Sequence, residues 1–333
     1  MKQGGGGMAS DQDGKLGNSL EIRVGVSACL MGDEVRYDGS HCNDRYVTGT
    51  LAAHFALVRV CPEEEVGMGT PRETVRLIGD VEAPEMIAKG SGTNWTKKMN
   101  QWSRRRVRQL EKEQLSGYIF KKNSPSCGVF RVKVYHETGH THKPGSGLFA
   151  AEFARHFPLV PIEEEGRLHD PSLRENFIER VFALDRLKKV FKGRWKRGQV
   201  IDFHAREKYL LMAHDPAGLK VLGQLAAAIS THAPTEFRDE YMSQYMKILT
   251  KKATTPKHSN ALQHVAGYLR THISPAEQKR VIAIIKEFQV GLVPLIVPIT
   301  LLRHYIELHD VSYVNNQSYL SPHPRELKLR NHV

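Results

Sequence analysis

Three short apolar runs, each followed by a cysteine, constrain the fold of this 333-residue chain more than any other feature. The cysteines that follow the runs at 22–26, 57–60 and 117–120 are Cys29, Cys61 and Cys127. Runs of this length and apolar character are typical of strands. In an open parallel sheet, the loops beyond the carboxyl ends of the strands gather at one edge, where ligands bind. The pattern therefore predicts one site to which three strands each supply a thiol.

The first half of the chain alternates strand-like and amphipathic segments, whereas the second half has helical patterns throughout. In the first half we expect strands at 22–27, 57–61, 117–120 and 129–136, and helices at 49–56 and 93–114. In the second half we expect helices at 174–189, 200–213, 217–229, 235–252, 260–271 and 274–290. This order predicts an α/β N-terminal domain with a mostly parallel, Rossmann-like sheet, followed by an all-α C-terminal domain.

The two predicted domains cover residues 22–165 and 170–333. Residues 1–21, which include four consecutive glycines, are expected to be a disordered tail or a segment added to the natural chain. The charged run at 163–167 is interpreted as the linker between the domains. The proline-rich tail at 319–333 is expected to wrap over the helices.

The net charge of +12 favours a polyanionic partner, because Lys and Arg that neutralise phosphates release counterions. A basic surface without a partner would give the same composition. No run reaches the ~20 apolar residues needed to span a bilayer, and residues 1–21 lack the apolar core of a signal peptide. Four cysteines in a chain of this length do not form a secreted disulfide scaffold. We therefore expect a cytoplasmic protein with reduced thiols and no membrane partner, and nothing implies a protein partner.

Three thiols from three loops are compatible with several kinds of site. Structural zinc normally takes four protein ligands, often with paired CxxC spacing, which this sequence lacks. Three cysteines well apart in sequence fit a [4Fe–4S] cluster with one iron that has no protein ligand. One thiol could instead be a catalytic nucleophile, or all three could be small buried residues. The residues alone leave these alternatives open.

The segments around the three cysteines resemble the signature motifs of the TudS-type thiouracil desulfidases. They read VGVSACLMGDEVRYDG, VCPEEEVGMGTPR and KKNSPSCG, in the family's order and spacing. The second half resembles the YbgA-type helical domain in AREKYLLMAH, LQHVAGYL, GLVPLIVPITLLRHY and NNQSYLSPHPRELKLRNHV. From about residue 22 the chain is thus similar to fused two-domain proteins that remove sulfur from 4-thiouridine in transfer RNA.

The resemblance implies that Cys29, Cys61 and Cys127 hold a [4Fe–4S] cluster with one open iron. It implies a non-redox, hydrolytic reaction in which water replaces the sulfur at C4 and hydrogen sulfide is released. Cys42 falls where the family has a lysine or another polar residue, so we expect a surface thiol there. Two rival functions remain: desulfuration of free thiouracil or thiolated nucleosides, and a non-catalytic RNA-binding regulator that holds an iron–sulfur cluster or zinc.

Two further residues beside the cysteines are candidates for catalysis. Glu63 is expected to be the general acid/base, although a carboxylate behind Pro62 could also simply stabilise a helix N-terminus. Ser124 is expected to hydrogen-bond the base or the attacking water. Ser126 competes for that role, and either serine could cap the following turn. Asp38 could orient Arg36 or substrate, but an Asp-Gly turn explains it as well.

A basic segment at 188–208, interleaved with Phe191 and Trp195, is the first candidate for binding transfer RNA, since cations meet phosphates and rings stack on bases. The RNA-binding residues chosen within it are Lys192, Arg194, Lys196 and Arg197. The segment from Trp102 to Arg106 is a second basic patch. A solvated helix face would give similar runs. The histidines of the second half are expected in polar networks rather than at a metal; they are His204, His214, His258, His264 and His304.

Overall fold

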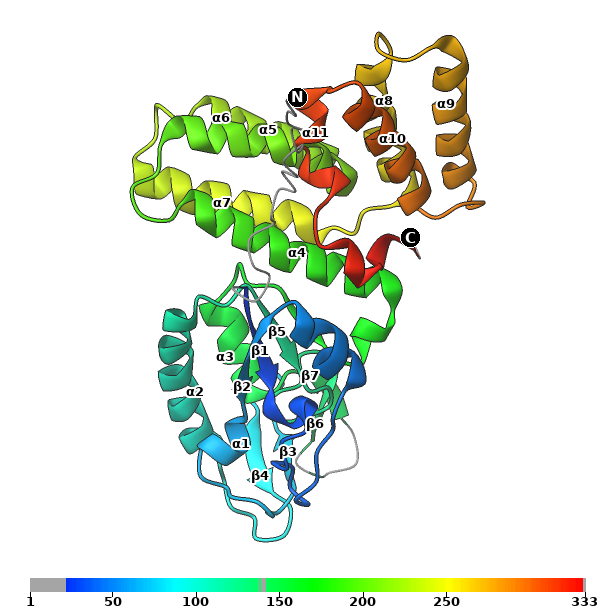
Figure 1. The fold of residues 1–333 in the computed structure, drawn as a ribbon. Coiled ribbons are helices and arrows are strands. Elements are labelled where there is room, and N and C mark those ends of the chain that lie inside the picture. Colours follow the sequence, from blue (N-terminus) through cyan, green and yellow to red (C-terminus); the bar gives the residue numbers. More distant parts are fainter. Residues whose placement is uncertain (1–21, 137, 139–141, 332–333) are drawn as a thin grey trace, which may run out of the picture.

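The computed structural model describes residues 22–136, 138 and 142–331, so the tail expected at 1–21 lies outside the described residues. The described chain has an α/β part, followed from about residue 170 by helices (Figure 1). The predicted fold class is therefore confirmed.

Four parallel strands form the first sheet, in the order β2-β1-β5-β8. The strands are β1 (Arg23–Ser27), β2 (Ala56–Val60), β5 (Gly117–Phe120) and β8 (Ile162–Glu164). The apolar runs at 22–26, 57–60 and 117–120 form β1, β2 and β5, as predicted. Because the strands are parallel, their carboxyl ends lie at the same edge of the sheet.

The interpretation of the charged run at 163–167 as a linker is wrong, because its start completes β8 and all three glutamates are buried. Each carboxylate has partners that compensate for burial. Glu163 pairs with Arg167 at 2.7 Å, and Glu165 pairs with Lys121 at 2.6 Å. Glu164 Oε1 accepts the backbone N–H groups of residues 129 and 130 at 2.8 and 3.0 Å. Buried charges are tolerated when they are paired in this way.

A second, mixed sheet has the order β4-β3-β6-β7, with β3 parallel to β6 and the outer pairs antiparallel. Its strands are β3 (Val75–Ile78), β4 (Glu85–Ala88), β6 (Val132–Tyr135) and β7 (His142–Gly145). Only β6 was predicted. The helix expected at 49–56 is replaced by a turn of π-helix, Tyr46–Thr50, and a turn of 3₁₀-helix, Leu51–Ala53.

Helices cover both faces of the first sheet. On one face, α2 (Thr96–Leu110) and α3 (Leu148–His156) pack against Tyr118 and Phe120 of β5. On the other, α4 (Pro171–Val190) packs through Phe177 and Val181 in the same core as Val24. A Cβ atom on Gly117 would lie 2.6 Å from Val181 Cγ2. This glycine is therefore what allows α4 to approach the sheet so closely.

The remaining helices form the second part of the fold, above the sheets in Figure 1. They are α5 (Arg197–His214), α6 (Pro216–Ala227), α7 (Pro234–Thr250), α8 (Thr255–Leu269), α9 (Pro275–Gln289), α10 (Ile296–Leu308) and α11 (Ser312–Asn315). The six helices predicted here correspond to α4–α9. We did not predict α10; Pro298 lies in its first turn, where a missing N–H breaks no intrahelical bond. None of the described helices is both long and apolar enough to cross a membrane.

The described part of the C-terminal tail returns to α4, where it packs in the core between this helix and the first sheet and does not only wrap over the helices, as the sequence suggested. Arg330 is buried and pairs with Glu175 at 3.4 Å and Glu179 at 3.3 Å, both on α4. Leu327 and Leu329 pack in the core that α4 forms with the first sheet. The helix α4 therefore contributes to the cores of both parts of the chain and ties them together.

Candidate functional site

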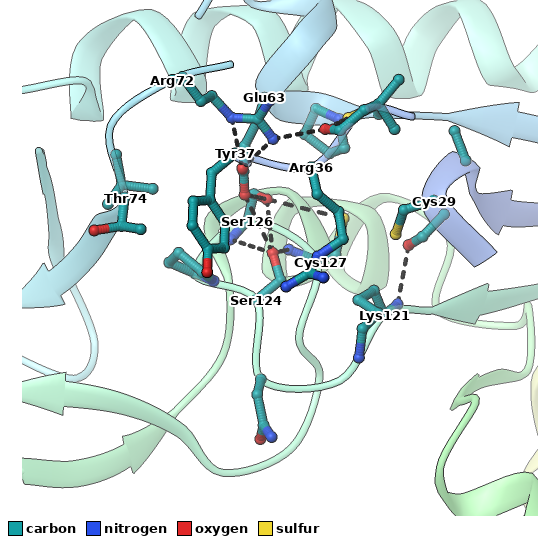
Figure 2. A pocket seen from close by; sticks show the side chains of 18 of the residues that line it. Cys29, Arg36, Tyr37, Glu63, Arg72, Thr74, Lys121, Ser124, Ser126 and Cys127 are labelled. Carbon is teal, nitrogen blue, oxygen red and sulfur yellow. Dashed lines mark hydrogen bonds and ion pairs between the residues drawn. The ribbon is translucent and has the colours of Figure 1, made fainter. Parts of the chain in front are cut away.

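A cavity of about 320 Å³ lies at the carboxyl edge of the first sheet. The loops that follow β1, β2 and β5 line it, and they bring Cys29, Cys61 and Cys127 into the same cavity (Figure 2). The structure thus gathers the three thiols that the sequence placed at three strand ends. Glu63, Ser124 and Ser126 line the same cavity.

Each cysteine has a different local setting. Cys29 lies in a single helical turn, Ala28–Met31, directly after β1. Cys61 immediately precedes the short helix α1 (Pro62–Glu65), and its Sγ lies 3.8 Å from the carbonyl oxygen of Val35. Cys127 is the most buried of the three, and its backbone N–H donates to Ser124 Oγ at 3.1 Å.

Burial raises the pKa of all three thiols. Burial, reinforced by Cys42 and Cys61, raises the pKa of Cys29 to about 12. Burial also raises the pKa of Cys61, and it raises that of Cys127 well above its usual range. Metal centres bind thiolates, so a centre bound here has to supply the positive charge that replaces these protons.

The fourth cysteine lies next to this group but does not line the cavity. Cys42 donates its backbone N–H to the carbonyl oxygen of Cys29 at 2.9 Å. Its side chain is half-buried and packs against the core of the first sheet. The expectation of a surface thiol is therefore met only in part.

Within the described ranges, no three His, Cys, Asp or Glu side chains are placed to hold one ion. Two of the histidines of the second half make polar contacts: His214 contacts Glu179, and His258 Nδ1 lies 3.1 Å from the hydroxyl of Tyr319. Thiolates of an iron–sulfur cluster bind different irons, so they lie farther apart than the ligands of one ion. Three soft thiols around a cavity fit that class of group.

Glu63 lies at the start of α1 with both carboxylate oxygens held. Arg72 donates to Oε2 from Nη2 at 2.6 Å and from Nε at 3.1 Å. Ser126 Oγ donates to Oε1 at 2.6 Å, and Ser124 Oγ lies 3.3 Å from the same atom. The side chains of Arg72 and Glu63 are only 6% and 15% exposed. Figure 2 shows this carboxylate between the arginine and the two serines.

The two candidate serines differ in their other contacts. Ser124 Oγ accepts the backbone N–H groups of Ser126 at 3.2 Å and Cys127 at 3.1 Å, so it caps the turn that presents Cys127. Ser126 is fully buried and makes the shorter bond to Glu63. Sequence reasoning missed Arg72, although it lies in the same motif, nine residues after Glu63.

The structure favours a turn, rather than the orientation of Arg36 or substrate, as the role of Asp38. Asp38 Oδ1 accepts the hydroxyl and the backbone N–H of Ser40 at 2.6 and 3.1 Å, as in a polar turn. Its ion pair with Arg36 is long, at 3.8 Å. Asp38 does not line the cavity, whereas Arg36 does.

The basic residues chosen for RNA binding lie between the end of α4 and the first residue of α5. All four are exposed; they are Lys192, Arg194, Lys196 and Arg197. The expected stacking role of Phe191 is wrong, because this ring is 8% exposed and belongs to the helical core. Trp195 packs edge-on against it, with ring centroids 5.3 Å apart.

The second basic patch, predicted at 102–106, is only partly exposed in the structure. Trp102 is buried against Phe149, and Arg106 pairs with Glu65 at 2.9 Å. Arg104 and Arg105 of this patch are exposed, and they line a shallow groove together with two exposed cations outside it, Arg108 and Lys112.

Comparison with known proteins gives a separate match for each part of the chain. Residues 24–165 match the family described as 2-thiouracil desulfurase, and residues 208–324 match DUF1722, described as a protein of unknown function. The uncharacterized protein YbgA of Escherichia coli K12 is 31% identical over 160 residues, which cover 47% of this chain and 93% of YbgA. The uncharacterized protein YbbK of Bacillus subtilis 168 is 33% identical over 132 residues, covering 38% and 85%. A solved structure of the [4Fe–4S]-dependent thiouracil desulfidase TudS is 25% identical, with a TM-score of 0.37, covering 45% of this chain and 94% of that one.

Proposed function

Since residues 24–165 of this chain belong to the 2-thiouracil desulfurase family and residues 208–324 to the DUF1722 family, we propose that the protein is a desulfidase that converts 4-thiouridine in transfer RNA to uridine. Family membership supports removal of sulfur from a thiolated uracil. The observation that most directly supports this reaction is the carboxylate of Glu63, which Arg72 holds in the same cavity as the three thiols. A non-catalytic regulator would not need that carboxylate.

The proposed reaction exchanges sulfur for oxygen without a change in oxidation state. Water adds to C4 of the base, the C–S bond breaks, and the products are a carbonyl group and hydrogen sulfide. Both protons of the water end on the sulfur, so no external oxidant or reductant is required.

The cofactor in this proposal is a [4Fe–4S] cluster held by Cys29, Cys61 and Cys127. Among the described residues that line the cavity there is no fourth cysteine and no histidine. When bound, such a cluster would supply an iron without a protein ligand, a Lewis acid suited to the soft thiocarbonyl sulfur.

The chain's own residues then have to move and hold protons. Glu63 Oε1 faces the hydroxyls of Ser124 and Ser126, so it is placed to take a proton from a water at that point and to return it to the departing sulfur. Arg72 keeps Oε2 fixed, which prevents the carboxylate from turning away. Preorganisation of this kind removes the need to reorient groups during the reaction.

The function is tested by turnover with the full chain after anaerobic reconstitution with iron and sulfide. Transfer RNA that contains 4-thiouridine should lose it, as measured by nucleoside mass spectrometry, and release an equal amount of sulfide. Transfer RNA from cells unable to thiolate uridine is the control. Release from free thiouracil but not from the RNA would assign the free base as substrate. A loaded protein that releases no sulfide from either would contradict desulfidase activity.

The RNA part of the proposal predicts an effect of the exposed cations between α4 and α5. Changing Lys192, Arg194, Lys196 and Arg197 together to glutamine should weaken binding of all transfer RNAs. It should also reduce the slope of log affinity against log salt by about 0.7–0.9 for each phosphate that the variant no longer neutralises. Filter binding at several salt concentrations measures both quantities.

The matched variant replaces Arg104, Arg105 and Arg108 on α2, three exposed cations of the desulfidase part. If the affinity and the salt slope change only in this second variant, the RNA-binding surface lies on α2 and not between α4 and α5. Loss of iron in either variant would show that the substitution had disturbed the fold rather than the RNA contact.

A further inference from the structure

Cys42 has no role in the proposed reaction, yet the fold fixes it beside one of the thiols that has one. Its backbone N–H donates to the carbonyl oxygen of Cys29 at 2.9 Å, and that of Asp44 donates to the carbonyl oxygen of Leu30 at 3.0 Å. These two bonds hold the segment of Cys42 alongside the helical turn that carries Cys29. The position of the fourth cysteine is therefore set by direct backbone contact with the first.

The two cysteines have the spacing that a disulfide requires. Residues joined by a backbone hydrogen bond of this kind have Cα atoms about 5.5 Å apart in a β-ladder, and disulfides join Cα atoms about 4.4–6.8 Å apart. Both side chains also pack against the same core, which includes Val24 and Phe177. Their proximity affects the pKa of Cys29, which burial raises first and Cys42 second, ahead of Cys61. The backbone thus already has the separation of a disulfide-bonded pair.

The loop between the two cysteines is also held in place. Arg72 Nη2 donates to the carbonyl oxygen of Val35 at 2.9 Å, and the backbone N–H of Arg72 donates to that of Tyr37 at 2.8 Å. Neither sulfur is sealed from small reagents, because Cys29 and Cys42 are only half-buried and Cys29 lines the cavity. A small oxidant therefore meets two accessible thiols that already lie side by side.

From this arrangement we propose that Cys29 and Cys42 form a redox switch. When no cluster is bound, a low-molecular-weight disulfide such as glutathione disulfide oxidises the pair to an intramolecular disulfide, which prevents the cluster from binding. The switch rests on the proposed function, in which Cys29 is a cluster ligand. A bound cluster occupies the sulfur of Cys29, so the cluster and the disulfide exclude one another.

The oxidation consists of two thiol–disulfide exchanges. The Cys42 thiolate attacks one sulfur of glutathione disulfide, whose S–S bond breaks and releases one glutathione. The Cys29 thiolate then attacks the Cys42 sulfur of this mixed disulfide and releases the second glutathione. The two cysteines lose two electrons and two protons in total, which the two glutathione molecules take up. The raised pKa of Cys29 keeps its thiolate scarce, but the second exchange is intramolecular, which increases its rate.

The disulfide would preserve a chain that has lost its cluster. A thiol that is oxidised further, to a sulfinic or sulfonic acid, is not restored by other thiols, whereas a disulfide is. The Cys29–Cys42 bond therefore stores the ligand in a form that a reducing environment returns to use. Loading of the cluster then depends on the thiol–disulfide balance around the protein.

Peptide mapping of the full chain without cluster tests the switch directly. Each of the four cysteines lies in a different tryptic peptide; these are 24–36, 37–45, 60–72 and 123–131. After incubation with glutathione disulfide and alkylation of the remaining thiols, mass spectrometry without reduction should find peptide 24–36 joined to 37–45. A chain loaded with cluster before the same treatment should not contain this pair.

The effect on loading is measured by transfer of a preformed cluster from a loaded carrier protein, with no added sulfide or thiol. The oxidised wild-type chain should take up no more iron than Cys29→Ser does. Treatment with dithiothreitol, followed by its removal, should restore uptake and so show that the fold is intact. Cys42→Ser is the matched variant, because it keeps the ligand set and should load equally well before and after oxidation.

Three results would overturn the switch. The first is a link between peptides 24–36 and 60–72, which would pair Cys29 with Cys61 instead. The second is a glutathione adduct on Cys42 that does not close to Cys29. The third is an equal loss of cluster uptake on oxidation in Cys42→Ser and wild type. The mapping uses no thiolated substrate, so the proposed function fails separately, if loaded wild-type protein releases no sulfide from any thiolated uracil.

Discussion

Replacing Cys29, Cys61 or Cys127 with serine should remove bound iron and activity together, whereas Cys42→Ser should leave both intact. Three thiols line one cavity at the carboxyl edge of the first sheet, and the fourth lies outside it. A cluster that already has an iron without a protein ligand has no spare thiolate, so the loss of any one ligand should abolish binding. Serine is close in size to cysteine but offers no soft donor.

The measurement is iron and acid-labile sulfide per chain after anaerobic reconstitution, together with the visible absorption of the protein. Cys42 is the matched control, because its backbone bonds to Cys29 and it is half-buried like Cys29 and Cys61. Thermal unfolding of each variant separates loss of the ligand from loss of the fold. Full iron content in a Cys61→Ser protein that unfolds normally would refute the ligand assignment.

The sequence was sufficient to locate this site because its signals are local. Each of β1, β2 and β5 is an apolar run flanked by glycine, proline or polar residues, and the parallel arrangement follows from strand–helix alternation. The helices of the second part were equally readable, since proline lies in the first turn of α4 and of α6–α9. One rule about strand ends was then enough to bring three cysteines together.

What the sequence did not reveal depends on contacts between distant residues. The strand β8 looks like a charged linker until Lys121 and the backbone amides after Cys127 are seen to hold its glutamates. The second sheet includes β7, whose sequence HKPG carries no apolar alternation. Pattern rules fail for such segments because tertiary partners, not local preference, decide their structure.

Contacts between distant residues also decide which side chains are exposed at the surface and which residues connect within the site. An aromatic residue among lysines suggested a stacking ring, but Phe191 is a core residue whose neighbours, such as Tyr241, come from a distant helix. Arg72 and Tyr37 each lie within a recognised motif, yet nothing in the motif says that a single arginine connects them. Only the fold shows that Arg72 bonds both to Glu63 and to the loop of Tyr37.

The clamp around Glu63 leads to the second large effect that we expect. Glu63→Gln should keep the cluster and lower kcat by about 10²–10⁴-fold, the usual contribution of a positioned acid/base. Glutamine has nearly the same shape, so its side-chain oxygen can still accept from Arg72, but the amide cannot take up a proton. Glu64→Gln is the matched control, because Glu64 is the next residue of α1, bonds to Thr70 at 2.7 Å and does not line the cavity.

Substitutions of the two serines should have different effects in the same assay, because their hydrogen bonds differ. Ser126→Ala removes the 2.6 Å donor to Glu63 and should lower kcat at unchanged iron content. Ser124→Ala also removes the acceptor for the backbone N–H of Cys127, so it should lower iron content as well as kcat. Single-turnover kinetics on anaerobically loaded protein, normalised to iron, measures both effects. A Glu63→Gln protein that turns over at the wild-type rate per iron would show that the proton transfer occurs at another atom. In that case the clamp by Arg72 would serve only to hold α1 against the Tyr37 loop.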